Sequence, residues 1–165
     1  MRKDAKSEAT GLGLAFMFSQ LGWVASNRFT KLISSIALTP PEAGLMRHLS
    51  SSPGITQQAF SKILKVVPSR MVVLVDSLEK KGLIERQRVE GDRRAYAITL
   101  TKAGENKLTA LAKIMVRHEL EFIAGLNPKE ISALRNLCTK FRAIHGLSDS
   151  VHPAYKKLGD KDTKK

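Results

Sequence analysis

Hydrophobic residues along most of this chain recur every three or four positions, the spacing that is typical of amphipathic helices. The first such stretch runs from Leu12 to Ile36, and its apolar stripe consists of Leu14, Met17, Leu21, Val24, Leu32 and Ile36. Phe18 and Phe29 widen this stripe. Because so broad an apolar surface usually packs on more than one small domain, we expect this helix to contact a surface beyond its own lobe.

The next helix has a clear start signal in Thr39-Pro40-Pro41-Glu42. The threonine is placed to cap the helix, a proline occupies the first helical position, and the glutamate occupies the third. This pattern predicts a capping box, in which each of the two side chains binds the other residue's backbone N–H. We expect the helix to end in the loop composition of residues 50–54.

Two further helices are predicted before residue 82. The first follows Thr56 as its cap and ends near Leu64, and Ile55 is spaced to pack on Phe60 as a hydrophobic staple. The second covers residues 68–81, because it opens at a proline and is followed by a glycine. Two short helices joined by a three-residue turn are the pattern of a helix-turn-helix.

The periodicity then changes from that of a helix to that of a strand. Residues 83–89 and 94–100 are predicted strands, and Glu90-Gly91-Asp92-Arg93 is the predicted turn between them. Helices follow over residues 101–124 and again from Asn127-Pro128-Lys129-Glu130, which repeats the capping pattern of the second helix. The predicted fold class is therefore mostly α with a small β-hairpin (α+β).

The charge balance indicates a polyanionic partner. The chain of 165 residues has 28 Lys and Arg against 15 Asp and Glu, a formal net charge of +13. Nucleic acid is the usual partner of so basic a chain, and a membrane surface is the alternative. No apolar run approaches the roughly 18 residues that span a bilayer, and the first residues lack the apolar core of a signal peptide. We expect a cytoplasmic protein that does not bind membranes.

No group of residues in this sequence has the spacing of a catalytic or metal site. Cys138 is the only cysteine, so neither an intrachain disulfide nor a cysteine zinc site can form. It lies on the apolar stripe of the last helix, which favours a buried structural cysteine over an oxidation sensor. The four histidines are scattered without ligand spacing, and no nucleophile is paired with a base. We expect no cofactor, no metal and no enzymatic activity.

Three motifs follow one another along the chain in a specific order. Ile55-Thr56-Gln57-Gln58 leads to residues 72–86, and Gly91-Asp92-Arg93-Arg94 and Leu100-Thr101-Lys102-Ala103-Gly104 come after them. This order is similar to the helix-turn-helix, the Asp-Arg-Arg wing tip and the Leu-Thr-x-x-Gly opening of the fifth helix in the MarR family of bacterial regulators. The resemblance extends from about residue 12 to residue 147.

The resemblance implies a winged helix-turn-helix that binds a pseudo-palindromic operator in double-stranded DNA as a homodimer. The regions that it implies are an N-terminal dimerisation helix at residues 1–36 and a DNA-binding lobe at residues 37–100. C-terminal dimerisation helices at residues 101–147 follow, and then a basic tail at residues 148–165 that we expect to be disordered.

The face of the fourth helix that lies away from its apolar residues is the candidate for DNA reading. Ser69, Arg70 and Val73 lie on this face near the N-terminus of the helix, the end that enters the major groove in helix-turn-helix proteins. Arg70 can donate two hydrogen bonds to guanine O6 and N7, and Val73 can touch a thymine methyl. The alternative for Arg70 is that it only neutralises a phosphate.

The hairpin is the second candidate contact. Arg94, held by Asp92 and next to Arg93, would enter a narrow minor groove, where the negative potential is greatest. The alternative is that both arginines are solvated turn charges. Arg86 and Arg88 share one face of the preceding strand and are expected to contact the DNA backbone. Lys62 and Lys65 are further candidate phosphate contacts.

Two positions depart from the family pattern. Lys65 stands in the turn where the family usually has glycine, and a lysine there costs about 1 kcal/mol if the turn needs a positive φ. Val67 stands where the family often has a polar cap, so the recognition helix is expected to start less firmly.

Regulation by a small molecule is a further implication of the family resemblance. DNA binding in this family is commonly released by a small aromatic or phenolic ligand or by thiol oxidation, so we expect a ligand-responsive repressor. Trp23 and Arg28 are candidates to line a ligand cavity between the dimerisation helices and the lobe, and a packing role for the tryptophan is the alternative. The alternative function is a ligand-insensitive architectural or partner-binding winged-helix protein.

Overall fold

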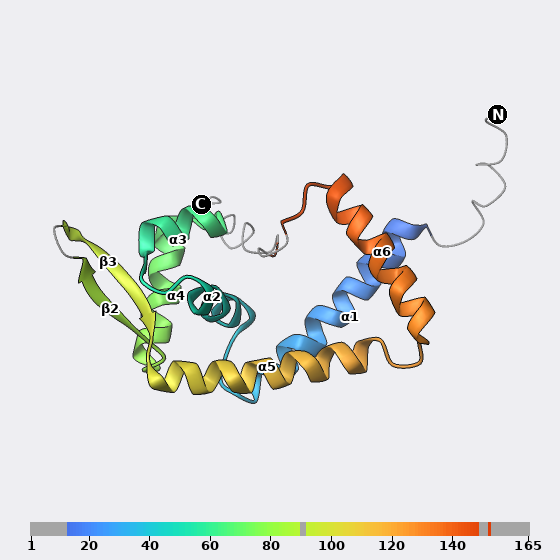
Figure 1. The fold of residues 1–165 in the computed structure, drawn as a ribbon, viewed down its shortest axis with the longest axis horizontal. Helices are drawn as coiled ribbons and strands as arrows, with labels where there is room; N and C mark the ends of the chain where they lie inside the picture. The colour runs from blue at the N-terminus through green and yellow to red at the C-terminus, as the bar shows by residue number, and fades with distance from the viewer. Residues whose placement is uncertain (1–12, 90–91, 149–151, 153–165) are drawn as a thin grey trace, which may run out of the picture.

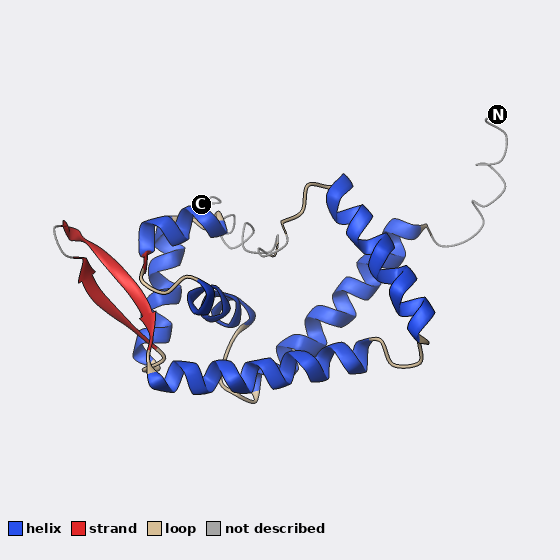
Figure 2. Cartoon of the chain, in the orientation of Figure 1, coloured by secondary structure: helices blue, strands red, loops and turns tan. Residues whose placement is uncertain are grey.

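The computed structural model describes residues 13–89, 92–148 and 152 of the chain, with the backbone alone at 92–95. In chain order the elements are α1 (Leu14–Ser34), α2 (Pro40–Ser51), β1 (Ile55–Thr56), α3 (Gln57–Leu64), α4 (Pro68–Lys80), β2 (Ile84–Val89), β3 (Asp92–Leu100), α5 (Lys102–Phe122) and α6 (Pro128–Ile144). Helices predominate and the strands form one small antiparallel sheet (Figure 2). This arrangement confirms the predicted fold class.

The local start signals in the sequence act as predicted. Thr39 N–H donates to Glu42 Oε2 at 2.8 Å while the threonine hydroxyl accepts from the Glu42 N–H, which completes the capping box of α2. Asn127 and Glu130 form the same box at the start of α6. Thr101 accepts a hydrogen bond from Gly104 N–H at 3.1 Å and caps α5. These caps satisfy backbone donors that have no partner inside their helices.

The sheet differs from the predicted hairpin in two respects. Its strand order is β1-β3-β2, because Ile55 and Thr56 add a third strand that the sequence did not predict. The predicted turn at residues 90–93 is also too long, since Asp92 and Arg93 already belong to β3 and Asp92 is paired with Val89. The register shifts between Arg88 and Val89, so the pairing of β2 with β3 is regular only from Ile84 to Arg88.

The hydrophobic core lies inside the lobe formed by α2, α3, α4 and the sheet. Its fully buried side chains are Ile33, Leu45, Met46, Leu49, Phe60, Leu64, Met71, Val75, Leu78, Ile84, Ile98 and Leu111. Ile33 comes from the end of α1 and Leu111 from α5, and both long helices also pack half-buried hydrophobic side chains against this core.

A close backbone contact fixes the start of α5 on the lobe. A Cβ at Gly104 would lie 2.0 Å from the carbonyl oxygen of Leu83, so only glycine fits there. The chain reaches this contact through Gly82, whose positive φ of 67° ends α4. Gly82 N–H donates to Glu79 O and Leu83 N–H donates to Leu78 O, which is the Schellman pattern of hydrogen bonds. The termination of α4 at this glycine was predicted from the sequence.

The long helices extend away from the lobe. In Figure 1, α5 runs along one side of the molecule from the sheet to the end where α1 and α6 lie. The rings of Phe18 on α1 and Phe141 on α6 meet edge to face with centroids 5.3 Å apart. No residue of α6 is buried within the protomer. Among the described residues, no helix has the length and hydropathy that a membrane span requires.

Candidate nucleic-acid interface

The turn between α3 and α4 is held by the backbone and by one buried hydroxyl. Ser61 Oγ donates to Val66 O at 2.5 Å, and the Val66 side chain is buried. Lys65 has a left-handed backbone with φ 52° and ψ 39°, the conformation for which glycine is the usual residue. The expected conflict between this lysine and the turn is therefore present in the structure.

The recognition helix starts as the sequence predicted, without a side-chain cap. Val67 occupies the cap position of α4 and accepts no hydrogen bond through its side chain, whereas Pro68 occupies the first helical position. Helix α4 therefore receives no capping hydrogen bond from a side chain, unlike α2, α3, α5 and α6, and its Arg70 N–H donates to the backbone oxygen of Val67 at 3.0 Å.

The two faces of α4 differ in the way that the sequence predicted. Met71, Val75 and Leu78 are completely buried, and Leu74 is half-buried against the core. On the opposite side Ser69 and Val73 are exposed, and Arg70 is half-buried. The structure therefore presents a hydroxyl, a guanidinium and an apolar side chain on one side of the first two turns of α4.

Basic side chains flank this surface. Lys62 on α3 and Lys65 in the turn are exposed, and Arg88 on β2 is exposed as well. Side chains of this kind near a helix-turn-helix are suited to contacts with phosphates. Asp92, Arg93 and Arg94 lie in β3, but their side chains fall outside the described residues, so their part in the wing stays a prediction.

Arg86 has a different environment from the one expected for a backbone contact. Its Nη1 atom donates to Glu79 Oε2 at 2.5 Å, and its Nη2 atom is paired with Asp76. Both carboxylates belong to α4, and the arginine side chain is only 22% exposed. The guanidinium therefore ties strand β2 of the wing to the recognition helix, whereas the expected contact with a phosphate remains a prediction.

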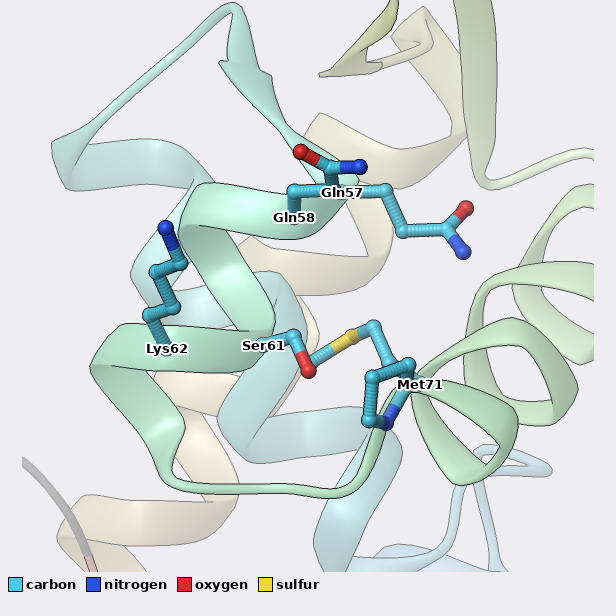
Figure 3. A pocket seen from close by; sticks show the side chains of 6 residues that line it. Gln57, Gln58, Ser61, Lys62 and Met71 are labelled. Atoms are coloured by element: carbon cyan, nitrogen blue, oxygen red, sulfur yellow. The ribbon is translucent and has the colours of Figure 1, made fainter.

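A pocket opens between α3 and the start of α4 (Figure 3). It has a volume of about 350 Å³ and is lined by Gln57, Gln58, Ser61, Lys62, Pro68 and Met71. The two glutamines lie in the first turn of α3, directly after its cap, and were quoted from the sequence only as part of a motif. The pocket adds their amides to the polar groups beside α4, which spacing alone could not show.

An ion pair with a buried carboxylate and a partly exposed lysine holds the far end of α4 in place. Lys81 Nζ donates to both carboxylate oxygens of Glu42 at 2.7 and 2.9 Å, and Ser77 Oγ donates to Oε1 at 2.7 Å. Burial alone would raise the pKa of Glu42 and is the largest single influence. The hydrogen bonds from Lys81, Ser77 and Thr39 together outweigh it, so the pKa of Glu42 lies below its usual value.

The candidate ligand residues lie on α1, away from this surface. Trp23 is 70% exposed in the protomer, and Arg28 Nη1 donates to the backbone oxygen of Glu121 on α5 at 3.1 Å. The pocket of Figure 3 does not include either residue. Cys138 on α6 is half-buried in the single chain and so less buried than the sequence predicted, because no other element buries any residue of α6. A role for Trp23 and Arg28 in ligand binding therefore remains a prediction.

Comparison with known proteins agrees with this arrangement. Residues 38–95 match a family model described as the MarR family. A Thauera aromatica protein named as a regulatory protein for the hcr operon is 29% identical over 143 residues, which cover 82% of this chain and 86% of that protein.

Two solved structures have the same fold. The transcriptional repressor CouR, bound to a 23-mer DNA duplex, superimposes with a TM-score of 0.69 at 25% identity, over 78% of this chain and 92% of CouR. A MarR family protein of Mycobacterium tuberculosis, in complex with salicylic acid, gives a TM-score of 0.63 at 22% identity, over 81% of this chain and 98% of that protein.

Proposed function

We propose that this chain is a transcriptional regulator of the MarR family that binds a specific site in double-stranded DNA. The observation that carries this proposal is the outward face of α4, where Ser69, Arg70 and Val73 lie beside the exposed Lys62 and Lys65. A helix with this face enters the major groove, and the wing β2–β3 reaches the neighbouring groove. The protein is a regulator and not an enzyme.

Support for a homodimer comes from the apolar surface of the terminal helices. Helix α6 has no buried residue, and α1 has one, Ile33. The large exposed apolar side chains of α1 and α6 are Leu14, Phe16, Met17, Phe18, Leu21, Trp23, Val24, Leu134, Leu137, Phe141 and Ile144. Two copies that cover these faces would bury most of these side chains, Trp23 excepted, so sedimentation should give twice the 18.2 kDa chain mass.

The dimer gives the four regions of the chain their roles. Residues 1–36 and 101–147 form the dimerisation region, residues 37–100 form the DNA-binding lobe, and residues 148–165 form a basic tail. Two lobes related by a two-fold axis read a pseudo-palindromic operator, whose half-sites lie about 10 base pairs, or a multiple of that, apart. A regulator of this kind works in the cytoplasm, where the DNA is.

We also propose that a small aromatic acid or phenol releases the protein from its operator. The salicylic acid complex of the Mycobacterium tuberculosis relative is the precedent for such an effector. Trp23 offers an exposed aromatic face and Arg28 a cation on the same helix, near the junction of α1 with α5. Titration with salicylate should lower the affinity of the wild-type protein for its operator, and Trp23→Ala should weaken that response.

The DNA-binding proposal is tested by selection followed by a single substitution. Full-length protein should enrich an inverted repeat from a pool of random duplexes. Arg70→Ala should then cost about 1–3 kcal/mol on the selected operator and much less on unrelated DNA, because a bidentate contact to guanine is lost. Fluorescence anisotropy at one fixed salt concentration measures both affinities.

A matched control separates base reading from general charge. Arg117→Ala removes an equally charged, exposed side chain from α5, outside the lobe. It should leave the ratio of specific to non-specific affinity unchanged. If Arg70→Ala weakens both DNAs equally, Arg70 is a phosphate contact. If the pool yields no common sequence, the proposed function is wrong.

A further inference from the structure

We propose that the recognition helix α4 selects its operator through the C5-methyl groups of pyrimidines, with Val73 as the contacting side chain. The inference rests on the proposed function, because it names the chemical group that the same DNA-binding surface recognises. The affinity of the protein for its operator should therefore depend on the base at one particular position and also on whether that pyrimidine carries a methyl group.

The first observation is an apolar side chain at the outermost position of α4. Val73 is 63% exposed, although Met71 and Val75 on the same helix have no exposed surface. At 3.6 residues per turn, or about 100° per residue, Val73 lies about 200° around the helix from Met71. It therefore points directly away from the core of the lobe.

Valine at this position brings no benefit to the isolated protein. A β-branched side chain in an exposed helix is less favourable than alanine, because the helix restricts its rotamers. Little burial offsets this cost at Val73, which is 63% exposed. A contact made only in a complex provides the missing benefit.

The chemistry of valine identifies the group that it can contact. Its side chain has neither a hydrogen-bond donor nor an acceptor, so it cannot read the polar pattern of a base edge. Among the base-edge groups of the major groove, the thymine methyl is the apolar one, and cytosine presents a methyl at the same carbon only when it is modified. A pyrimidine C5-methyl is therefore the partner that matches Val73.

The surrounding charges direct this surface toward DNA. Lys62 and Lys65 are exposed beside α4, and Arg70 lies three residues before Val73. These cations complement a phosphate backbone, which an apolar protein or lipid partner would not require. Charge and shape together place the valine against a groove floor lined by base edges.

The spacing of Arg70 and Val73 predicts where the methyl lies. Three residues of helix correspond to a rise of about 4.5 Å, whereas base pairs are stacked about 3.4 Å apart. The two side chains also lie only about 60° apart around the helix. We therefore expect the methylated pyrimidine one or two steps from the guanine that Arg70 reads.

The experiment replaces single thymines of the selected operator by deoxyuridine, which lacks only the methyl group. Replacement of the contacted thymine in a single half-site should lower the affinity of the wild-type protein about fourfold. This factor corresponds to about 0.8 kcal/mol for one buried methyl. Replacement in both half-sites should give about a fifteenfold loss. An operator with 5-methylcytosine at that position should be bound about fourfold more tightly than the same operator with cytosine, because the two differ by one methyl group.

Two substitutions assign the effect to one side chain. Val73→Ser removes both γ-methyl groups, so it should weaken binding to the thymine operator and abolish the response to deoxyuridine. Val72→Ser makes the same change at the adjacent position, which is 40% exposed and faces the side of Glu79 and the wing. This second variant should retain the wild-type response.

Each alternative outcome is decisive. Equal affinity for thymine and deoxyuridine at every position would overturn the proposal while leaving the DNA-binding function intact, because the operator has still been selected. A deoxyuridine effect that persists in Val73→Ser would assign the methyl contact to another residue and would also overturn it. Failure to select any operator would instead refute the function on which the inference rests.

Discussion

Replacement of Glu42 by glutamine should destabilise the protein strongly, although the two side chains have the same shape. The carboxylate is 3% exposed and accepts hydrogen bonds from Lys81, Ser77 and Thr39. Through these bonds it joins the start of α2 to the end of α4. Lys81 also donates to the oxygen of Ala37 at 3.0 Å, so the turn between α1 and α2 belongs to the same network.

The expected magnitude follows from what glutamine preserves. Its amide oxygen still accepts from the Thr39 N–H, so the capping box largely survives. The ion pair is lost, and breaking a buried pair costs about 3–5 kcal/mol when the remaining charge stays buried. Because the Lys81 side chain is 35% exposed and can turn toward water, we expect a smaller loss, about 2–3 kcal/mol.

Urea unfolding at a fixed protein concentration measures this loss, and pH supplies a second test. The pKa of Glu42 is lowered in the folded protein, so its contribution to stability is fully present above the pKa of the unfolded chain, about 4.3. It should disappear as the pH falls through the lower pKa of the folded state. The difference between wild type and Glu42→Gln should therefore be constant near neutral pH and shrink in acid.

An exposed ion pair provides the control. Glu105 pairs with Lys102 at 2.9 Å, but these two side chains are 57% and 85% exposed. Glu105→Gln should cost less than about 0.5 kcal/mol, since water replaces such a pair readily. The reasoning would be refuted if the two variants lost similar amounts, or if the loss in Glu42→Gln did not change with pH.

Three other substitutions test local geometry. Gly104→Ala should cost more than about 2 kcal/mol in urea unfolding, because its Cβ would collide with Leu83 O; a loss near zero would contradict the close contact. Lys65→Gly should stabilise the protein by about 0.5–1 kcal/mol in the same assay, since glycine removes the left-handed strain at a smaller entropic cost. Arg86→Gln should speed hydrogen exchange in β2, and unchanged exchange would show that the pairs with Asp76 and Glu79 do not hold the wing.

Features that depend on neighbouring residues were predictable from the sequence. The capping boxes at Thr39 and Asn127 each need two side chains three residues apart, and Gly82 ends α4 through bonds to the preceding turn. The burial of one face of α4 likewise follows from the helical spacing of apolar residues within the thirteen residues of this helix. In each case the interacting groups lie within one or two helical turns, so their spacing along the chain determines their spacing in space.

Features that depend on tertiary contacts were not predictable in this way. Ile55 lies opposite Ile98 in the sheet, 43 positions later in the chain, and a strand of two residues has no period of its own. Arg86 alternates with Gln87 as a groove-facing residue would, but the folded chain places Asp76 and Glu79 within its reach. A period of two identifies the face of a strand and carries no information about the helix that packs near it.

The length of α5 has a mechanical consequence. At about 1.5 Å per residue, its 21 residues form a rod about 32 Å long that joins the lobe to the end of the molecule where α1 and α6 lie. A tilt of about 6° at one end of such a rod displaces the other end by about 3.4 Å, the height of one base-pair step. A small molecule that wedged α1 and α5 slightly apart would therefore carry the lobe out of register with its half-site while every contact inside the lobe remained intact.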